Sequence, residues 1–273
     1  MKKVLGLLIA MIMGGSAFAS ITVSPTKMEI NANKIKNNYM TTAVEIKGEA
    51  DRAIRYRAYT GYFEISDKSE MIMKESSDNP HDLSKKVRFV PSEFTVPPGK
   101  SQKVRVNIAG IKTLPDGESR AVLFLEDVNP KEMSLPSQTS GIGAQLLLKT
   151  RVGIPIYVDK GKFTRKADIE TFNIVRKNKV LYTETKIVST GTSKIRYNGL
   201  IQVIQGKKLI AEYPLEGKVV GGNNSYIARQ KIETDKLDKS GEYTLRLIFS
   251  YFDENDNRKN IKKDAILKIT GEI

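Results

Sequence analysis

The feature that most constrains the fold of this chain is an alternation of apolar and polar residues that recurs along most of its length. Residues 103–108 show it clearly, because Val104, Val106 and Ile108 share one face and the residues between them are polar. A period of two is typical of a strand with one buried face. No stretch combines a helical period with helix caps. The sequence therefore predicts an all-β protein.

Turn-forming residues divide the alternating segments. Proline, glycine and Asp-Gly occur between them, as at residues 97–99 and 114–119. Residues 66–86 and 129–140 are predicted to be polar loops. The alternation breaks again at Asp-Lys-Gly, residues 159–161. The chain is long enough for two cores, and about seven strands on each side of this break would form two β-sandwiches. We predict a first domain at 20–158 and a second at 162–273.

Residues 1–19 have the pattern of a secretory signal peptide. Lys2 and Lys3 precede an apolar run at residues 4–13, and Ala17-Phe18-Ala19 fits the A-x-A cleavage pattern. The apolar run is short for a membrane-spanning helix, and no other segment approaches the required length. We expect cleavage after Ala19 and a soluble exported product, with an uncleaved anchor as the alternative.

The composition argues against catalysis and against bound metals. The chain has no cysteine, which excludes disulfides and thiolate metal sites. One histidine, His81 in a polar segment, supports neither a histidine metal site nor a catalytic triad, and we expect it to be solvated. Asp253 and Asp256 depart from the EF-hand spacing and indicate a turn. No phosphate-binding loop is present in the sequence. We predict no enzyme activity, metal, cofactor or ATP.

The chain is strongly basic. Its formal net charge is +14, and two of these charges belong to the predicted signal peptide. Such a charge is compatible with nucleic acid, anionic polymers or acidic proteins as partners. The lysines, however, are spread along the predicted strands, without a dense block or an aromatic-basic motif. We expect a solvated basic surface and no nucleic-acid partner.

Several short motifs follow one another in the first predicted domain. They are Pro25-Thr-Lys27, Val90-Pro91, Val96-Pro-Pro-Gly99, Gln102-Lys-Val-Arg-Val106 and Leu114-Pro-Asp-Gly-Glu-Ser119, followed by an alternating strand at residues 142–152. In this order and spacing the chain resembles the PapD-like periplasmic chaperones of chaperone/usher pilus assembly, as a divergent member. The resemblance covers most of residues 20–158. It implies two immunoglobulin-like β-sandwich domains in an angled arrangement.

The resemblance assigns a role to the alternating strand. In that family this strand is a donor strand, which completes the open sandwich of a pilus subunit by β-strand addition. The matching donor residues lie on one face of the strand and are Ile142, Ala144, Leu146 and Leu148. From the alternation alone, the same residues could instead be the buried face of an ordinary core strand of an exported β-sandwich. A free donor strand could also mediate self-association.

The resemblance further implies a basic anchor for the carboxylate at the end of the subunit. Lys27 matches its first residue, and the second would lie at Gly153, so that Arg151 on the same strand face is the candidate replacement. Glu118 matches a glutamate that ties the two domains together, although the position of its arginine partner holds Tyr157.

Together these features predict a periplasmic chaperone that binds and stabilises fimbrial or pilus subunits by donor-strand complementation. It would deliver them to an outer-membrane usher for fimbrium biogenesis. The alternative is a structural or adhesive two-domain β-sandwich protein of the cell surface. A basic protein that binds anionic envelope polymers is a third possibility, and its binding would weaken steeply with salt.

Overall fold

The computed structural model describes residues 21–74, 78–129, 131–135, 144–178, 180–235, 237 and 240–270. For residues 131–135, 144–146 and 148 only the backbone is described. The predicted signal peptide and Ile142 lie outside these ranges. Within them, no helix is long and apolar enough to cross a membrane.

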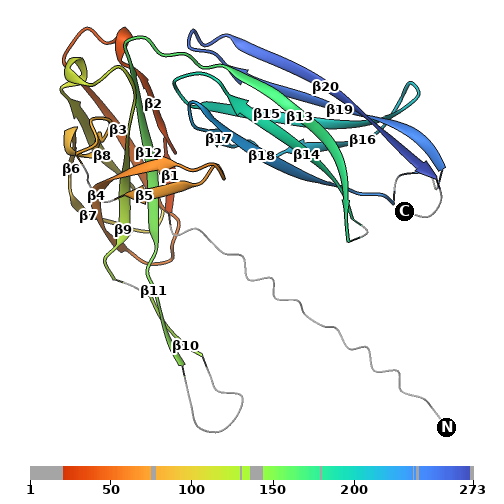
Figure 1. Ribbon diagram of the computed structural model, residues 1–273. Coiled ribbons are helices and arrows are strands. Elements are labelled where there is room, and N and C mark those ends of the chain that lie inside the picture. The colour runs from red at the N-terminus through yellow and green to blue at the C-terminus, as the bar shows by residue number, and fades with distance from the viewer. Residues whose placement is uncertain are drawn as a thin grey trace, which may run out of the picture.

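The described chain forms two β-sandwiches set at an angle to each other (Figure 1), which confirms the predicted fold class. One hydrophobic core draws its residues from Ile21 to Val158, and the other from Ala167 to Ile269. The only helical elements in the described ranges are short 3-10 turns, namely η1 (Ala32–Lys34), η2 (Ser84–Lys86) and η3 (Ile111–Thr113).

The first domain consists of two packed sheets. One sheet has the order β1 (Ile21–Ser24), β3 (Tyr39–Gly48), β8 (Ser101–Ala109) and β6 (Val87–Val90). The other has the order β2 (Met28–Asn31), β12 (Arg151–Lys160), β9 (Gly117–Asp127), β4 (Ile54–Ile65) and β5 (Met71–Lys74), with β7 (Glu93–Val96) paired to β4.

Alternation in the sequence correctly identifies the strand faces of this domain. Val104, Val106 and Ile108 of β8 are fully buried between the sheets, as their spacing predicts. Pro25 lies where the chain leaves β1 in one sheet and enters β2 in the other. Proline cannot donate to a strand ladder, so it is tolerated at such a switch.

Two segments that the sequence predicts to be loops contain strands. Strand β5 lies within residues 66–86 and pairs with the end of β4, while Leu83 of the same segment is fully buried in the first core. Strand β10 (Lys131–Leu135) lies within residues 129–140 and pairs with β11 (Ala144–Leu148). Both are edge or hairpin strands, whose formation depends on a partner strand more than on a strong pattern of their own.

The second domain packs a three-stranded sheet against a larger one. The first has the order β13 (Ala167–Lys177), β14 (Val180–Ser189) and β18 (Asn224–Ile232). The second has the order β16 (Lys208–Leu215), β15 (Ile195–Gln205), β19 (Ser240–Phe252) and β20 (Arg258–Thr270), with β17 (Val219–Val220) paired to β15.

Candidate functional site: a protruding hairpin and a basic pocket between the domains

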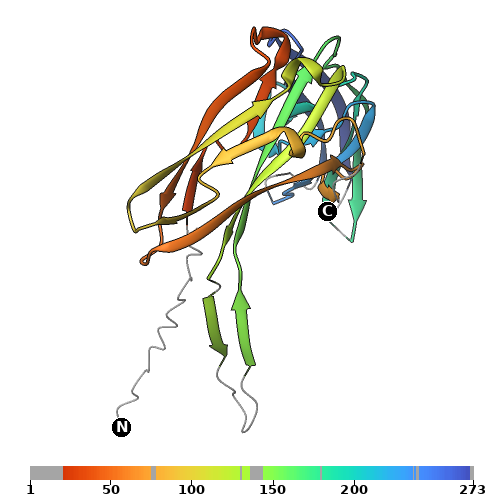
Figure 2. The same ribbon diagram turned by 90° about the vertical axis from the view of Figure 1, so that its left-hand side faces the viewer.

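Strands β10 and β11 form a hairpin that projects away from both sandwiches, as two perpendicular views show (Figures 1 and 2). The two strands pair from Lys131 opposite Leu148 to Leu135 opposite Ala144. In the described part of the chain β11 has no other partner strand, so its second edge is unpaired. The donor residues Ala144, Leu146 and Leu148 therefore lie on a strand with a free edge. Their side chains and Ile142 lie outside what the structure describes.

The free edge continues from β11 into the start of β12. Between Arg151 and Pro155, β12 pairs with β9 on one side only among the described residues. On the other side, β2 pairs with β12 in the parallel direction. This pairing begins at Ile156, which lies opposite Met28. The unpaired edge therefore ends at the residue that precedes β2, which is Lys27.

Gly153, where the resemblance leads one to expect a basic side chain, lies in tight surroundings. A Cβ atom at this position would lie 3.1 Å from both a ring carbon of Phe124 and Cγ2 of Val122. Phe124 lies opposite Gly153 in the β9–β12 ladder, and its ring fills the space above the glycine. A larger residue here would require the Phe124 ring and the Val122 side chain to shift by a few tenths of an ångström.

Arg151 is engaged on the outer face of the same sheet. Its guanidinium lies 4.5 Å from the centre of the Phe124 ring, and Nη1 donates a hydrogen bond of 3.2 Å to Tyr59 Oη. The hydrogen bond with Tyr59 raises the pKa of Arg151. No described contact joins Arg151 to Lys27. The structure therefore does not bring the two predicted anchor residues together.

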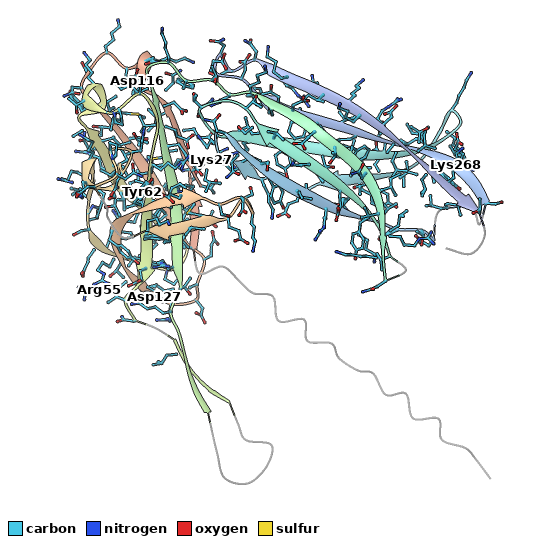
Figure 3. The ribbon with its side chains drawn as sticks, viewed as in Figure 1. Lys27, Arg55, Tyr62, Asp116, Asp127 and Lys268 are labelled. Carbon is cyan, nitrogen blue, oxygen red and sulfur yellow. The ribbon has the colours of Figure 1, made fainter. Side chains whose placement is uncertain are left out.

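Lys27 lies on the flank of the first domain that faces the second (Figure 3). It borders a pocket of about 350 Å³ between the domains, which is lined by Lys27, Glu29, Arg165, Lys194, Arg196, Asn198 and Phe252. Glu29 is the only acidic residue of this lining. Its carboxylate lies 3.7 Å from Lys27 Nζ and 3.4 Å from the Arg196 guanidinium.

Positive charge accumulates around Lys27. Partial burial lowers the pKa of Lys27, the nearby carboxylate of Glu29 opposes this, and the charges of Arg196 and Lys194 lower it further. Like charges that crowd together disfavour the protonated amine. The pocket is therefore a place where an added anion would be stabilised.

Glu118 lies at the junction between the domains, where it is buried. Its Oε2 is 3.1 Å from Lys194 Nζ and 3.0 Å from Ser193 Oγ, both in the second domain, and its Oε1 is 2.5 Å from Arg120 Nε. Lys194 Nζ also lies 3.8 Å from the centre of the Tyr157 ring. Tyr157 stands at the position of the expected arginine, and its aromatic ring contacts the Lys194 ammonium of the second domain.

The charge of Glu118 is stabilised by this arrangement. Burial would raise its pKa, but the charges of Lys194 and Arg120 and their hydrogen bonds outweigh burial and hold the pKa at about 2. A second buried carboxylate, Asp159, accepts a hydrogen bond from Ser193 Oγ and pairs with Arg165. The junction is therefore a network of charges contributed by both domains.

Lys194, Arg196 and Phe252 were not identified from the sequence. Lys194 directly precedes β15, Arg196 lies near the start of that strand, and Phe252 is the last residue of β19. Arg196 is separated by 167 residues from Glu29, its partner in the pocket. Nothing in a single sequence indicates such a pairing across domains.

Two remaining sequence predictions can be placed. His81 is only partly exposed, and its Nδ1 is buried without a hydrogen-bond partner in the described part of the molecule, so the expectation that it is solvated was wrong. Asp253 closes a turn, because its carboxylate accepts backbone N–H groups of Asn255 and Asn257. Among the described residues no cluster of three potential metal ligands occurs.

No protein-family model matches the sequence, and no curated protein matches it either. Among solved structures, the YadV chaperone superposes with a TM-score of 0.46 at 10% identity, over 91% of this chain and 100% of that one. The CsuC–CsuE chaperone–tip adhesion subunit complex of Acinetobacter baumannii gives a TM-score of 0.45 at 14% identity, over 89% and 98%. The Salmonella enterica SafA pilin–SafB chaperone complex gives 0.42 at 12%, over 91% and 96%.

Proposed function

We propose that this protein is a periplasmic chaperone of the chaperone/usher type, which captures pilus or fimbrial subunits by donor-strand complementation. The observation that carries the proposal is the unpaired edge of β11 and β12. Among the described residues this edge has no partner strand; it starts on the hairpin outside both sandwiches, continues along the start of β12 in the first domain and ends beside a basic pocket. A strand with a free edge and an alternating apolar sequence is suited to complete the sheet of another protein.

The partner of such a strand is a β-sandwich that lacks one strand and exposes a groove in its core. The backbone of β11 would supply ladder hydrogen bonds, which do not depend on the partner's sequence. Ile142, Ala144, Leu146 and Leu148 would fill successive positions in the groove and fix the register. Full burial of a leucine-sized side chain contributes roughly 1.5–3 kcal/mol, so these residues would supply several kcal/mol of binding free energy.

The pocket charge favours one direction for the added strand. A strand that pairs along β11 and β12 meets β2 at Met28 and must end there. If it runs parallel to β12, its carboxyl end lies at Lys27; if it runs antiparallel, its ammonium end does. The positive charge of the pocket favours the carboxylate, so Lys27 is the first residue of the anchor.

The leucines of the donor strand provide the direct test. Leu146→Glu together with Leu148→Glu should abolish capture of a subunit, since charged side chains cannot enter an apolar groove without a large desolvation cost. The mature chain would be co-expressed with each small exported protein encoded next to it, and complexes would be purified and quantified. Leu209→Glu, at a half-exposed leucine of β16 in the second domain, is the matched control. Capture by a folded double variant would refute the proposal.

The first anchor residue is tested separately. Lys27→Ala should weaken binding of the captured subunit about tenfold or more, because a hydrogen bond to a charged group contributes about 1.5–3 kcal/mol. Isothermal titration calorimetry at low salt would measure the change. An unchanged affinity would show that Lys27 is not part of the anchor. It would not bear on the role proposed for the donor strand. If instead the purified chain assembles with itself through β11 and captures no subunit, the structural or adhesive alternative is favoured.

A further inference from the structure

We propose that Arg196 of the second domain is the second cation of the anchor, so that the carboxylate at the end of a captured chain is held by both domains at once. We further infer that Phe252 contacts the side chain of the last residue. Both inferences rest on the function proposed above and specify how the pocket between the domains would be used.

The ion pairs around the pocket leave two cations incompletely neutralised. Arg165 is paired with buried Asp159, and Lys194 with buried Glu118. Lys27 and Arg196 are left to share the single carboxylate of Glu29, at 3.7 Å and 3.4 Å. Charged hydrogen bonds normally span about 2.7–2.9 Å, so neither cation has a close partner within the part of the chain that the structure describes. A second carboxylate would complete this arrangement.

Arg196 suits this role better than either candidate on β12. Gly153 cannot be replaced by a basic residue without displacing the Phe124 ring, and Arg151 already covers that ring and contacts Tyr59. Arg196, by contrast, lines the same pocket as Lys27, and its side chain is 37% exposed, which leaves donors accessible from the pocket. A planar guanidinium also binds a carboxylate in a bidentate manner, which lysine cannot do.

Phe252 gives the pocket an apolar wall. It is 53% exposed at the end of β19, although an aromatic ring is usually more buried than this. It lies in the lining together with Arg196 and the amide side chain of Asn198. A ring at the mouth of a cationic pocket suits a ligand that carries a carboxylate and an apolar group next to each other. A chain that ends in an apolar residue has this chemistry.

A small-molecule probe tests the pocket without any subunit. N-acetylphenylalanine presents a carboxylate beside an aromatic side chain, and its amide derivative differs only in lacking the charge. The mature chain would be titrated with the acid while its backbone amide NMR signals are recorded. The signals of Arg196, Asn198 and Phe252 should shift. The amide derivative should leave them unshifted, and Arg196→Gln should abolish the effect of the acid. Absence of these shifts, or equal shifts with acid and amide, would overturn the inference.

The captured subunit provides the second test, with a free carboxyl end or with a carboxamide made by intein cleavage. Arg196→Gln should weaken binding of the free acid about ten- to a hundredfold and leave binding of the carboxamide unchanged, because only the acid offers a charge to the guanidinium. Arg229→Gln is the matched control, since Arg229 on β18 makes a surface ion pair with Glu184 on β14. Phe252→Ala should weaken binding of a subunit that ends in an apolar residue more than one whose last residue is changed to glycine.

The two proposals fail in different ways. If the wild-type chain captures no subunit, donor-strand capture is wrong. If capture is normal and Arg196→Gln binds the free acid as tightly as wild type, only the role of Arg196 is wrong. An equal loss for acid and carboxamide would show that Arg196 merely holds the two domains together through Glu29, and it too would overturn the inference.

Discussion

The carboxylate of Glu118 lies between two cations, Arg120 of its own domain and Lys194 of the other. A buried charge of this kind is costly to desolvate and is stabilised only while both partners stay in place. Its contribution to stability is therefore conditional on the junction being intact.

Glu118 should make the stability of the protein depend on acid pH. Its pKa is about 2 in the folded protein and 4.5 ordinarily, so its charge stabilises the folded state above pH 4.5. This contribution, about 3 kcal/mol, is lost as the pH falls from 4.5 towards 2. Glu118→Gln should lower the unfolding temperature at pH 7, and the difference from wild type should shrink below pH 4. Thermal unfolding followed by circular dichroism measures both. Exposed Glu45→Gln is the control, and a difference that stays constant with pH would contradict the assignment.

Two threonines of β14 are expected to lower the stability of the folded protein, so replacing them should raise the unfolding temperature. Thr183 and Thr185 are fully buried in the second domain, and their hydroxyls have no hydrogen-bond partner in the described part of the molecule. An unsatisfied buried hydroxyl costs about 1–3 kcal/mol, and valine has nearly the same shape without it. Thr183→Val and Thr185→Val should therefore each raise the unfolding temperature by a few degrees. Thr95→Val, at an exposed position of β7, should change little. A lowered unfolding temperature would mean that a buried water bonds these hydroxyls.

At the scale of elements, the hairpin of β10 and β11 is separate from the sandwiches. Each of the two strands pairs only with the other among the described residues. Replacing residues 129–148 by Asn-Gly, which favours a tight hairpin turn, should join Val128 to Lys149 and leave both cores intact. We expect an unfolding temperature within about 2 °C of wild type and complete loss of subunit capture. Differential scanning calorimetry and co-purification provide the two measurements. A large drop in stability would show that the hairpin belongs to the fold of the first domain.

Elements with a strong alternating pattern could be predicted from the sequence, and those that depend on a neighbour could not. Val104, Val106 and Ile108 alternate without interruption, and β8 is a central strand of its sheet. Strand β5 reads Met-Ile-Met-Lys, without alternation, and all four residues are exposed. It forms because the end of β4 leaves the ladder with β9 after Gly61 and offers it a partner.

At the scale of the whole molecule, the junction charges hold the two sandwiches together. Lys194→Met would leave Glu118 buried with one cation fewer, at a cost of about 3–5 kcal/mol for breaking a buried ion pair. In differential scanning calorimetry we expect the wild type to unfold in one transition and Lys194→Met to unfold in two, one for each domain. Lys186→Met, which removes an exposed pair with Glu170, is the control. Two transitions already present in the wild type would show that the domains unfold independently.

The candidate site was predictable only where it lies on one continuous segment. The donor face of residues 142–148 and Lys27 could be proposed because strand alternation and a local motif mark them. The pocket depends on the angle between two domains, which brings Arg196 to Glu29 across 167 residues. The glycine at 153 looked like a missing anchor in the sequence, whereas in the structure it is the space that the Phe124 ring occupies.

The position at which β2 joins β12 has a consequence for the partner. Because β2 already occupies the sheet edge from Ile156 onward, an added strand cannot slide past that point. The distance along the sheet edge from Ile156 to the apolar positions of β11 is therefore fixed. It sets the length of added strand that fits between the two. If the protein captures subunits as proposed, it would accept a polypeptide only if its chain terminates at the matching distance from its groove, and would thereby distinguish finished subunits from truncated or extended ones.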